Sequence, residues 1–84
     1  MDHIIVNFCP FTMNQNVLVY QNGVCVEQLS LPIERIKDSV FGLKNKYHIS
    51  QIDLCGSQDY LSKIKAEMLT DFKNENCNIN IYSK

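Results

Sequence analysis

Residues 16–31 read NVLVYQNGVCVEQLSL, and this stretch decides how the fold begins. Two runs rich in β-branched residues flank Asn22-Gly23, and both central positions of a type I′ hairpin turn need positive φ. The stretch therefore predicts an antiparallel hairpin with Tyr20 opposite Cys25 and Val19 opposite Val26. On this register one face carries Val17, Val19, Val24 and Val26, and the other carries Leu18, Tyr20, Cys25 and Leu29. Because both faces are largely apolar, we expect both to be covered at least in part.

A strand is predicted before the hairpin, over residues 3–9, HIIVNFC. It is rich in β-branched and aromatic residues and stops at a proline, which cannot donate a ladder hydrogen bond. Residues 10–16, PFTMNQN, form the connection to the hairpin. The chain is therefore expected to begin with three antiparallel strands.

Two helices are predicted after the hairpin. Ser30 is expected to cap the first, over residues 31–47, whose apolar positions recur every three or four residues: Ile33, Ile36, Val40, Leu43 and Tyr47. Ser57 is expected to cap the second, over residues 58–76, with an apolar stripe of Tyr60, Leu61, Ile64, Met68, Leu69 and Phe72.

A strand is predicted after each helix. Residues 48–56, HISQIDLCG, have Ile52 and Leu54 as inward positions, which leaves Asp53 on the opposite face. Residues 77–83, CNINIYS, alternate between two faces, with Cys77, Ile79 and Ile81 inward and Asn78, Asn80 and Tyr82 outward. This polar outer face indicates an exposed or edge strand.

The predicted order is β-β-β-α-β-α-β, which places the chain in the α/β class. Right-handed crossovers make the last two strands parallel additions to the antiparallel set, so we expect a five-stranded mixed sheet with two helices. Eighty-four residues without a linker or repeat predict a single domain over 1–84.

This order of elements resembles the ribonuclease H-like fold, which also forms each lobe of actin-like ATPases. Residues 49–68, ISQIDLCGSQDYLSKIKAEM, resemble the strand-turn-helix of actin-like proteins, and the resemblance implies that Gly56 lies near a nucleotide. The chemistry of the family is not matched. Asn7 stands where the family has an aspartate on the first strand, no glycine follows it in the next turn, and the chain has one lobe where the nucleotide site needs two.

Composition narrows the functional class. The net charge of the chain is −1, whereas a nucleic-acid binder usually carries a basic surface, so we expect no nucleic-acid partner. The start, MDHIIVNF, has no basic lead, and no segment approaches the length of a membrane span, so we expect a soluble, cytoplasmic protein without membrane contact. The four cysteines form no C-x-x-C pair and are expected to be reduced apolar fillers. Abundant Asn, Lys and Ile suggest a phage or prophage origin.

A possible ligand corner lies at Asp53, Gly56 and Ser57, because ligands bind at the carboxyl ends of parallel strands. The structural interpretation is that Gly56 permits the turn, Ser57 caps a helix and Asp53 is solvated. The structural interpretation is favoured, since one glycine is far from a phosphate-binding loop.

No catalytic residue, metal site or cofactor is expected. His3, His48 and the cysteines have no zinc spacing, and no cysteine has a recognisable catalytic partner. A degenerate metal site at Glu34 and Asp53 is kept as an alternative, which would make the chain a metal-dependent nuclease or phosphotransferase.

Two surfaces are candidates for protein contact. Phe11 and Met13 stand in the loop between the first two strands, where large apolar side chains either meet a partner or fold back over the sheet. Asn78, Asn80 and Tyr82 mark the last strand, whose edge can pair with another chain. We therefore expect a small non-enzymatic binding or adaptor domain whose partner is another protein or a second copy.

Overall fold

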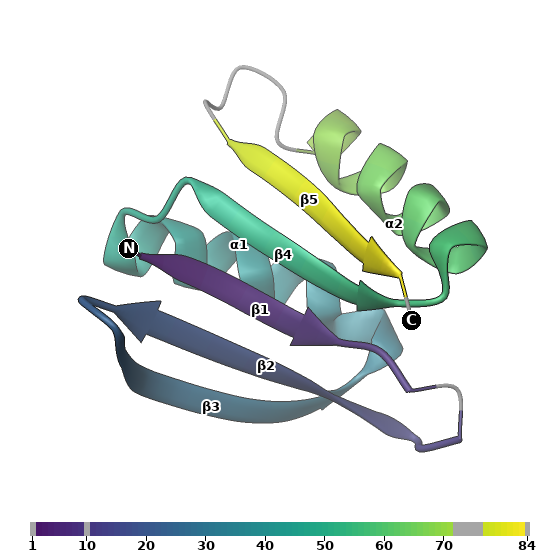
Figure 1. Cartoon of the computed structure of the whole chain (residues 1–84), viewed down its shortest axis with the longest axis horizontal. Coiled ribbons are helices and arrows are strands. Elements are labelled where there is room, and N and C mark those ends of the chain that lie inside the picture. The colour runs from purple at the N-terminus through teal and green to yellow at the C-terminus, as the bar shows by residue number, and fades with distance from the viewer. Residues whose placement is uncertain (1, 10, 72–76, 84) are drawn as a thin grey trace.

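The computed structural model describes residues 2–9, 11–71 and 77–83 (Figure 1). Its strands are β1 (His3–Asn7), β2 (Asn14–Gln21), β3 (Val24–Pro32), β4 (Gln51–Gly56) and β5 (Asn78–Ser83). A short 3₁₀ helix, η1 (Ile33–Arg35), leads into α1 (Ile36–Tyr47), and α2 (Gln58–Asp71) joins β4 to β5.

The five strands form one mixed sheet in the order β3-β2-β1-β4-β5. Strands β1, β2 and β3 are antiparallel neighbours, whereas β4 is parallel to β1 and β5 is parallel to β4. The α/β class, the order of elements and the edge position of β5 are therefore confirmed. Both crossover connections run toward β5, so the right-handed rule places both helices on one face of the sheet.

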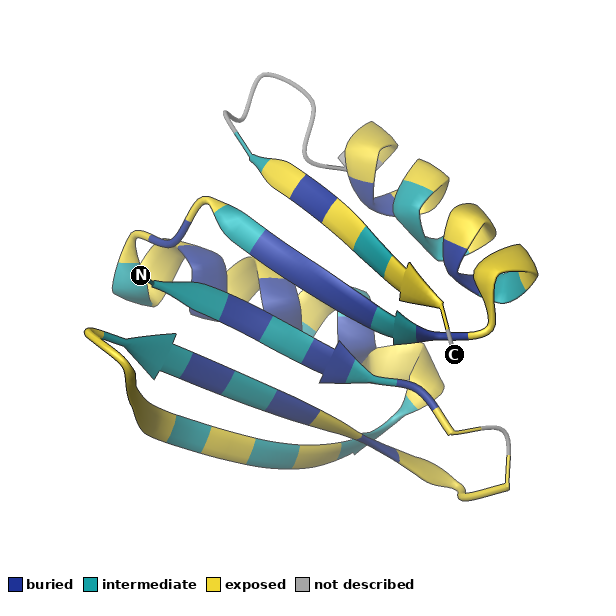
Figure 2. Cartoon of the chain, in the orientation of Figure 1, coloured by how far each residue is buried: buried dark blue, intermediate teal, exposed yellow. Residues whose placement is uncertain are grey.

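The core lies between the helices and that one face. Alternate residues of β2, β1, β4 and β5 are buried there together with helix residues: Ile4, Val6, Val17, Val19, Ile36, Val40, Leu43, Ile52, Leu54, Leu61, Met68 and Ile79 (Figure 2). The other face carries half-buried and exposed residues, apart from the buried Asp53. We expected cover on both faces of the hairpin, and in the described residues helices cover only one.

The hairpin has the predicted turn but a different register. Asn22 and Gly23 have φ of 55° and 79°, and Tyr20 pairs with Cys25 as predicted. Val19, however, pairs with Glu27, because the register shifts by one residue and leaves Val26 as a β-bulge. The predicted opposition of Val19 and Val26 is therefore wrong. The bulge turns Leu29 onto the face of Val17, where it packs against the core, and leaves Val26 43% exposed.

The first helix begins later than predicted. Ser30 pairs with Asn16 inside β3, so it does not cap a helix, and Ile33 in η1 is 38% exposed. The reason is that β3 keeps its ladder with β2 as far as Pro32. The helix ends at Tyr47, because His48 adopts the left-handed conformation and its N–H donates to the Lys44 carbonyl.

The second helix begins after Ser57, as predicted. Leu61 and Met68 are fully buried, but Leu69 is 48% exposed, so it does not belong to the core stripe. Phe72, the last predicted member of that stripe, lies outside the described residues. Within the described residues, neither helix has the length and apolar character needed to cross a bilayer.

Candidate functional site

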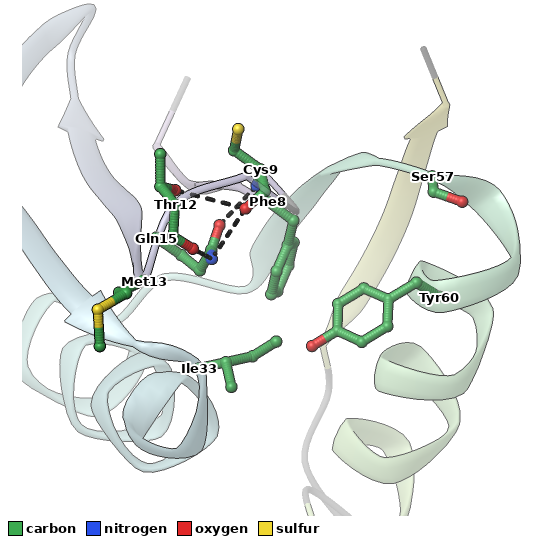
Figure 3. A pocket seen from close by; sticks show the side chains of 8 residues that line it. All are labelled: Phe8, Cys9, Thr12, Met13, Gln15, Ile33, Ser57 and Tyr60. Atoms are coloured by element: carbon green, nitrogen blue, oxygen red, sulfur yellow. Dashed lines mark hydrogen bonds between the residues drawn. The ribbon is translucent and has the colours of Figure 1, made fainter.

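A pocket of about 280 Å³ opens at the carboxyl ends of β1 and β4. Its walls come from three regions that are distant in the sequence: the end of β1 with the β1–β2 loop and the start of β2, then η1, and then the start of α2. The lining residues are Phe8, Cys9, Thr12, Met13, Gln15, Ile33, Ser57 and Tyr60 (Figure 3). None of these eight side chains belongs to a charged residue type, so the pocket suits an apolar group.

The floor of the pocket forms where β1 and β4 end side by side. The Phe8 N–H donates to the Cys55 carbonyl at 2.9 Å, which extends the ladder with β4 one residue past the end of β1. Gly56 then turns the chain into α2 with a φ of 150°, and a Cβ atom built there would lie 3.2 Å from both Cβ and the carbonyl oxygen of Phe8. Glycine is therefore needed at position 56, both for the close approach of the backbone to Phe8 and for the turn into α2.

One wall of the pocket is aromatic. The rings of Phe8 and Tyr60 meet edge to face with centroids 5.4 Å apart. Burial raises the pKa of the Tyr60 hydroxyl, and the nearby carboxylates of Glu67 and Glu34 raise it further. The hydroxyl therefore stays protonated at neutral pH, and it points across the opening toward Ile33 (Figure 3).

The opposite wall is a loop held in shape by Gln15. This buried side chain donates to the Cys9 and Thr12 carbonyls, both at 3.2 Å, and accepts the Cys9 N–H. Phe11 and Met13 nevertheless project outward and are each 92% exposed. The alternative in which they fold back over the sheet is therefore wrong, whereas partner contact by this loop stays a prediction.

The predicted corner of Asp53, Gly56 and Ser57 is divided between the two faces of the sheet. Ser57 lines the pocket and Gly56 lies against Phe8, which also lines it, but Asp53 lies on the face away from the helices. We expected Asp53 to be solvated, and it is only 5% exposed.

Side chains on the two neighbouring strands form hydrogen bonds with the buried carboxylate of Asp53. Its carboxylate lies 2.8 Å from Nδ1 of His3 on β1 and accepts a 3.2 Å hydrogen bond from the Asn80 amide on β5. The Gln51 amide contacts both carboxylate oxygens at 3.4 and 3.5 Å. Sequence reasoning missed this cluster because it depends on strand register. The register aligns Asp53 with Asn80 on β5 and places His3, on the neighbouring strand β1, within reach of the Asp53 carboxylate.

The two carboxylates of the alternative metal site are not brought together. Glu34 lies on η1, where it influences Tyr60 on the helical side, whereas Asp53 occupies the other face. Across residues 2–9, 11–71 and 77–83, no group of three or more His, Cys, Asp or Glu side chains is arranged to hold a metal ion.

The last strand lies as predicted, with its polar positions outward. Asn78, Asn80 and Tyr82 are exposed, while Ile79 is buried and Ile81 packs against the core. Asn80 also has a structural role, because its amide donates a hydrogen bond to Asp53.

No family model, curated protein or solved structure matches this chain.

Proposed function

We propose that this chain is a small, non-enzymatic protein-binding domain whose contact site is the Phe11–Met13 loop with the pocket beside it. One observation carries the proposal: of the large apolar side chains in the described residues, the two most exposed stand on a hydrogen-bonded loop at the rim of an uncharged pocket. Exposed apolar groups of this kind mark interaction sites, and a loop already held in one shape loses little entropy on binding.

The pocket indicates what the partner supplies. An apolar protein cavity of about 150 Å³ is large enough to hold benzene, and this pocket measures about 280 Å³. An aromatic or branched aliphatic side chain of a partner therefore fits within it. Met13 lines the rim, and its flexible thioether can adapt to side chains of different shape.

The architecture supports a binding role without the chemistry of the family it resembles. The sheet order β3-β2-β1-β4-β5 supports the resemblance to the ribonuclease H-like fold. Asn7 ends β1 with a neutral amide at the position of the family's aspartate, and Mg²⁺ prefers carboxylate ligands. We therefore propose the architecture and not the nuclease or nucleotide chemistry, and we propose a cytosolic location, where the four cysteines, which form no disulfide, stay reduced.

A peptide-display selection tests this function. Random peptides are selected on the immobilised wild-type chain, on Phe11→Ala/Met13→Ala, and on Val24→Ala, which changes an exposed apolar residue at the far hairpin. We expect the wild type and Val24→Ala to enrich peptides with an aromatic or large aliphatic residue, and the double variant to lose at least tenfold in enrichment. Equal enrichment on all three chains would refute the proposed site.

A further inference from the structure

The two edges of the sheet differ in their protection against pairing with another strand. β3 carries the bulge at Val26, the charged Glu27 and Pro32, all of which discourage strand addition. β5 reads NINIYS and has none of these features, and it pairs with β4 without a register shift from Asn78 to Ser83. β5 is therefore the straight, uncharged edge of the described sheet.

The backbone of β5 presents a regular set of outward groups. The Asn78 N–H donates to the Ser50 carbonyl at 2.7 Å, toward β4. Because successive backbone groups of a strand point to opposite sides, those of Ile79, Ile81 and Ser83 point away from β4. The isoleucine side chains remain in the core, so a new strand can bond to these groups without disturbing the packing.

The helix beside β5 offers an apolar residue at the same edge. On α2, Leu61 and Met68 face the sheet, and Glu67 faces α1 through a 3.6 Å ion pair with Lys37. At about 100° per residue, Leu69 lies on the flank turned away from α1, which is the flank toward the outer side of β5 (Figure 1). Leu69 is 48% exposed there, with the small Ser62 two turns before it and the half-buried Lys65 one turn before it on the same flank.

We propose that a second copy of this chain pairs antiparallel along β5 about a two-fold axis. The two five-stranded sheets then form one continuous sheet, and the two α2 helices meet across the axis through Leu69. A second copy fits because antiparallel pairing of identical strands is self-complementary and β5 carries no charge to repel its own copy. A domain of this size also gains from burying more surface.

Pairing along β5 is independent of the Phe11–Met13 loop, which joins β1 to β2 and leaves that site free on each copy.

Light scattering over a wide range of concentration gives the first test. We expect twice the 9.7 kDa chain mass for the wild type and for Phe11→Ala. Ser83→Pro removes an outward N–H without removing a bond to β4, and Leu69→Lys places like charges across the axis, beside the Lys65 of each copy. We expect each to weaken dimerisation at least tenfold while circular dichroism shows a folded chain. A wild type that stays monomeric, or a dimer lost only in Phe11→Ala, would overturn the proposal.

Amide hydrogen exchange gives a second readout that does not depend on a variant. In a monomer, protection should alternate along β5, with Asn80 protected by β4 and Ile79 and Ile81 exchanging fast. In the dimer, Ile79 and Ile81 also become protected as concentration rises. Dimer mass without this added protection would place the interface elsewhere and contradict the proposal.

Discussion

Gly56 is the residue on which the turn from β4 into α2 most depends. We expect Gly56→Ala to cost about 2 kcal/mol of unfolding free energy, because its positive φ and its contact with Phe8 both oppose a Cβ atom. Gly42 in α1 is the matched control, since a Cβ there meets nothing within 4 Å. Gly42→Ala should stabilise the chain by up to about 1 kcal/mol. Urea unfolding measures both, and equal effects would contradict the role given to Gly56.

Asp53 is buried on the sheet face opposite the helices. We expect Asp53→Asn to destabilise the chain by about 1–3 kcal/mol, because hydrogen bonds to a charged acceptor are stronger than those to an amide. The exposed Asp59, at the start of α2, is the control, and Asp59→Asn should cost less than about 1 kcal/mol. Thermal unfolding compares the two. A cost for Asp53→Asn no larger than the control would mean that the contacts with His3 and Asn80 contribute little.

Glu27 and Tyr47 form an acid-sensitive contact at the surface. The Tyr47 hydroxyl donates to Glu27 at 2.6 Å and holds the pKa of that carboxyl below its ordinary value of 4.5, with Lys46 adding to the effect. The resulting stability is present above pH 4.5 and is lost as pH falls through the lowered pKa. The same bond raises the pKa of Tyr47 above 10.0, so its contribution is lost again in alkali, as pH rises through the raised value.

We therefore expect Tyr47→Phe to flatten the acid side of the stability profile, measured by urea unfolding between pH 3 and 6. An acid side as steep as that of the wild type would show that the contact is absent in solution.

At the scale of elements, the hairpin of β2 and β3 shows which structural features the sequence predicts and which it does not. Asn22-Gly23 predicts the turn from two residues, but the bulge depends on packing, since it brings Leu29 and Leu31 to the core. The same limit explains Ser30, which has a capping side chain but remains in the ladder with Asn16. Local propensity identified the strands and helices, and their register and exact ends followed from contacts between elements.

Deleting Val26 tests the role of the bulge. Tyr20 still pairs with Cys25 and Val19 with Glu27, so the hairpin becomes regular and the chain should remain folded. We expect the variant to form assemblies larger than the wild-type species, because β3 then becomes a second straight edge. Light scattering on the folded variant checks this. An unchanged mass would mean that Glu27 and Pro32 protect β3 without the bulge.

At the scale of the whole molecule, the sequence predicted the order of the elements better than the site. The order of strands and helices follows from periodicity and the handedness of crossovers, and Phe11 and Met13 stood out as apolar residues in a loop. The pocket was not predictable, because it needs the contact between Phe8 and Tyr60, which are far apart in the sequence. Nor was the Asp53 cluster, which joins β1, β4 and β5.

The most direct measurement is a nuclear magnetic resonance titration of the ¹⁵N-labelled chain with N-acetyl-phenylalaninamide, which carries the phenyl group that the pocket should receive. We expect saturable shifts at the amides of Phe8, Cys9, Thr12, Ser57 and Tyr60, and none at Val24 in the distant hairpin. Absence of shifts at the pocket residues up to the solubility limit of the probe, or shifts of equal size at Val24, would contradict a side-chain-binding site between the loop and α2.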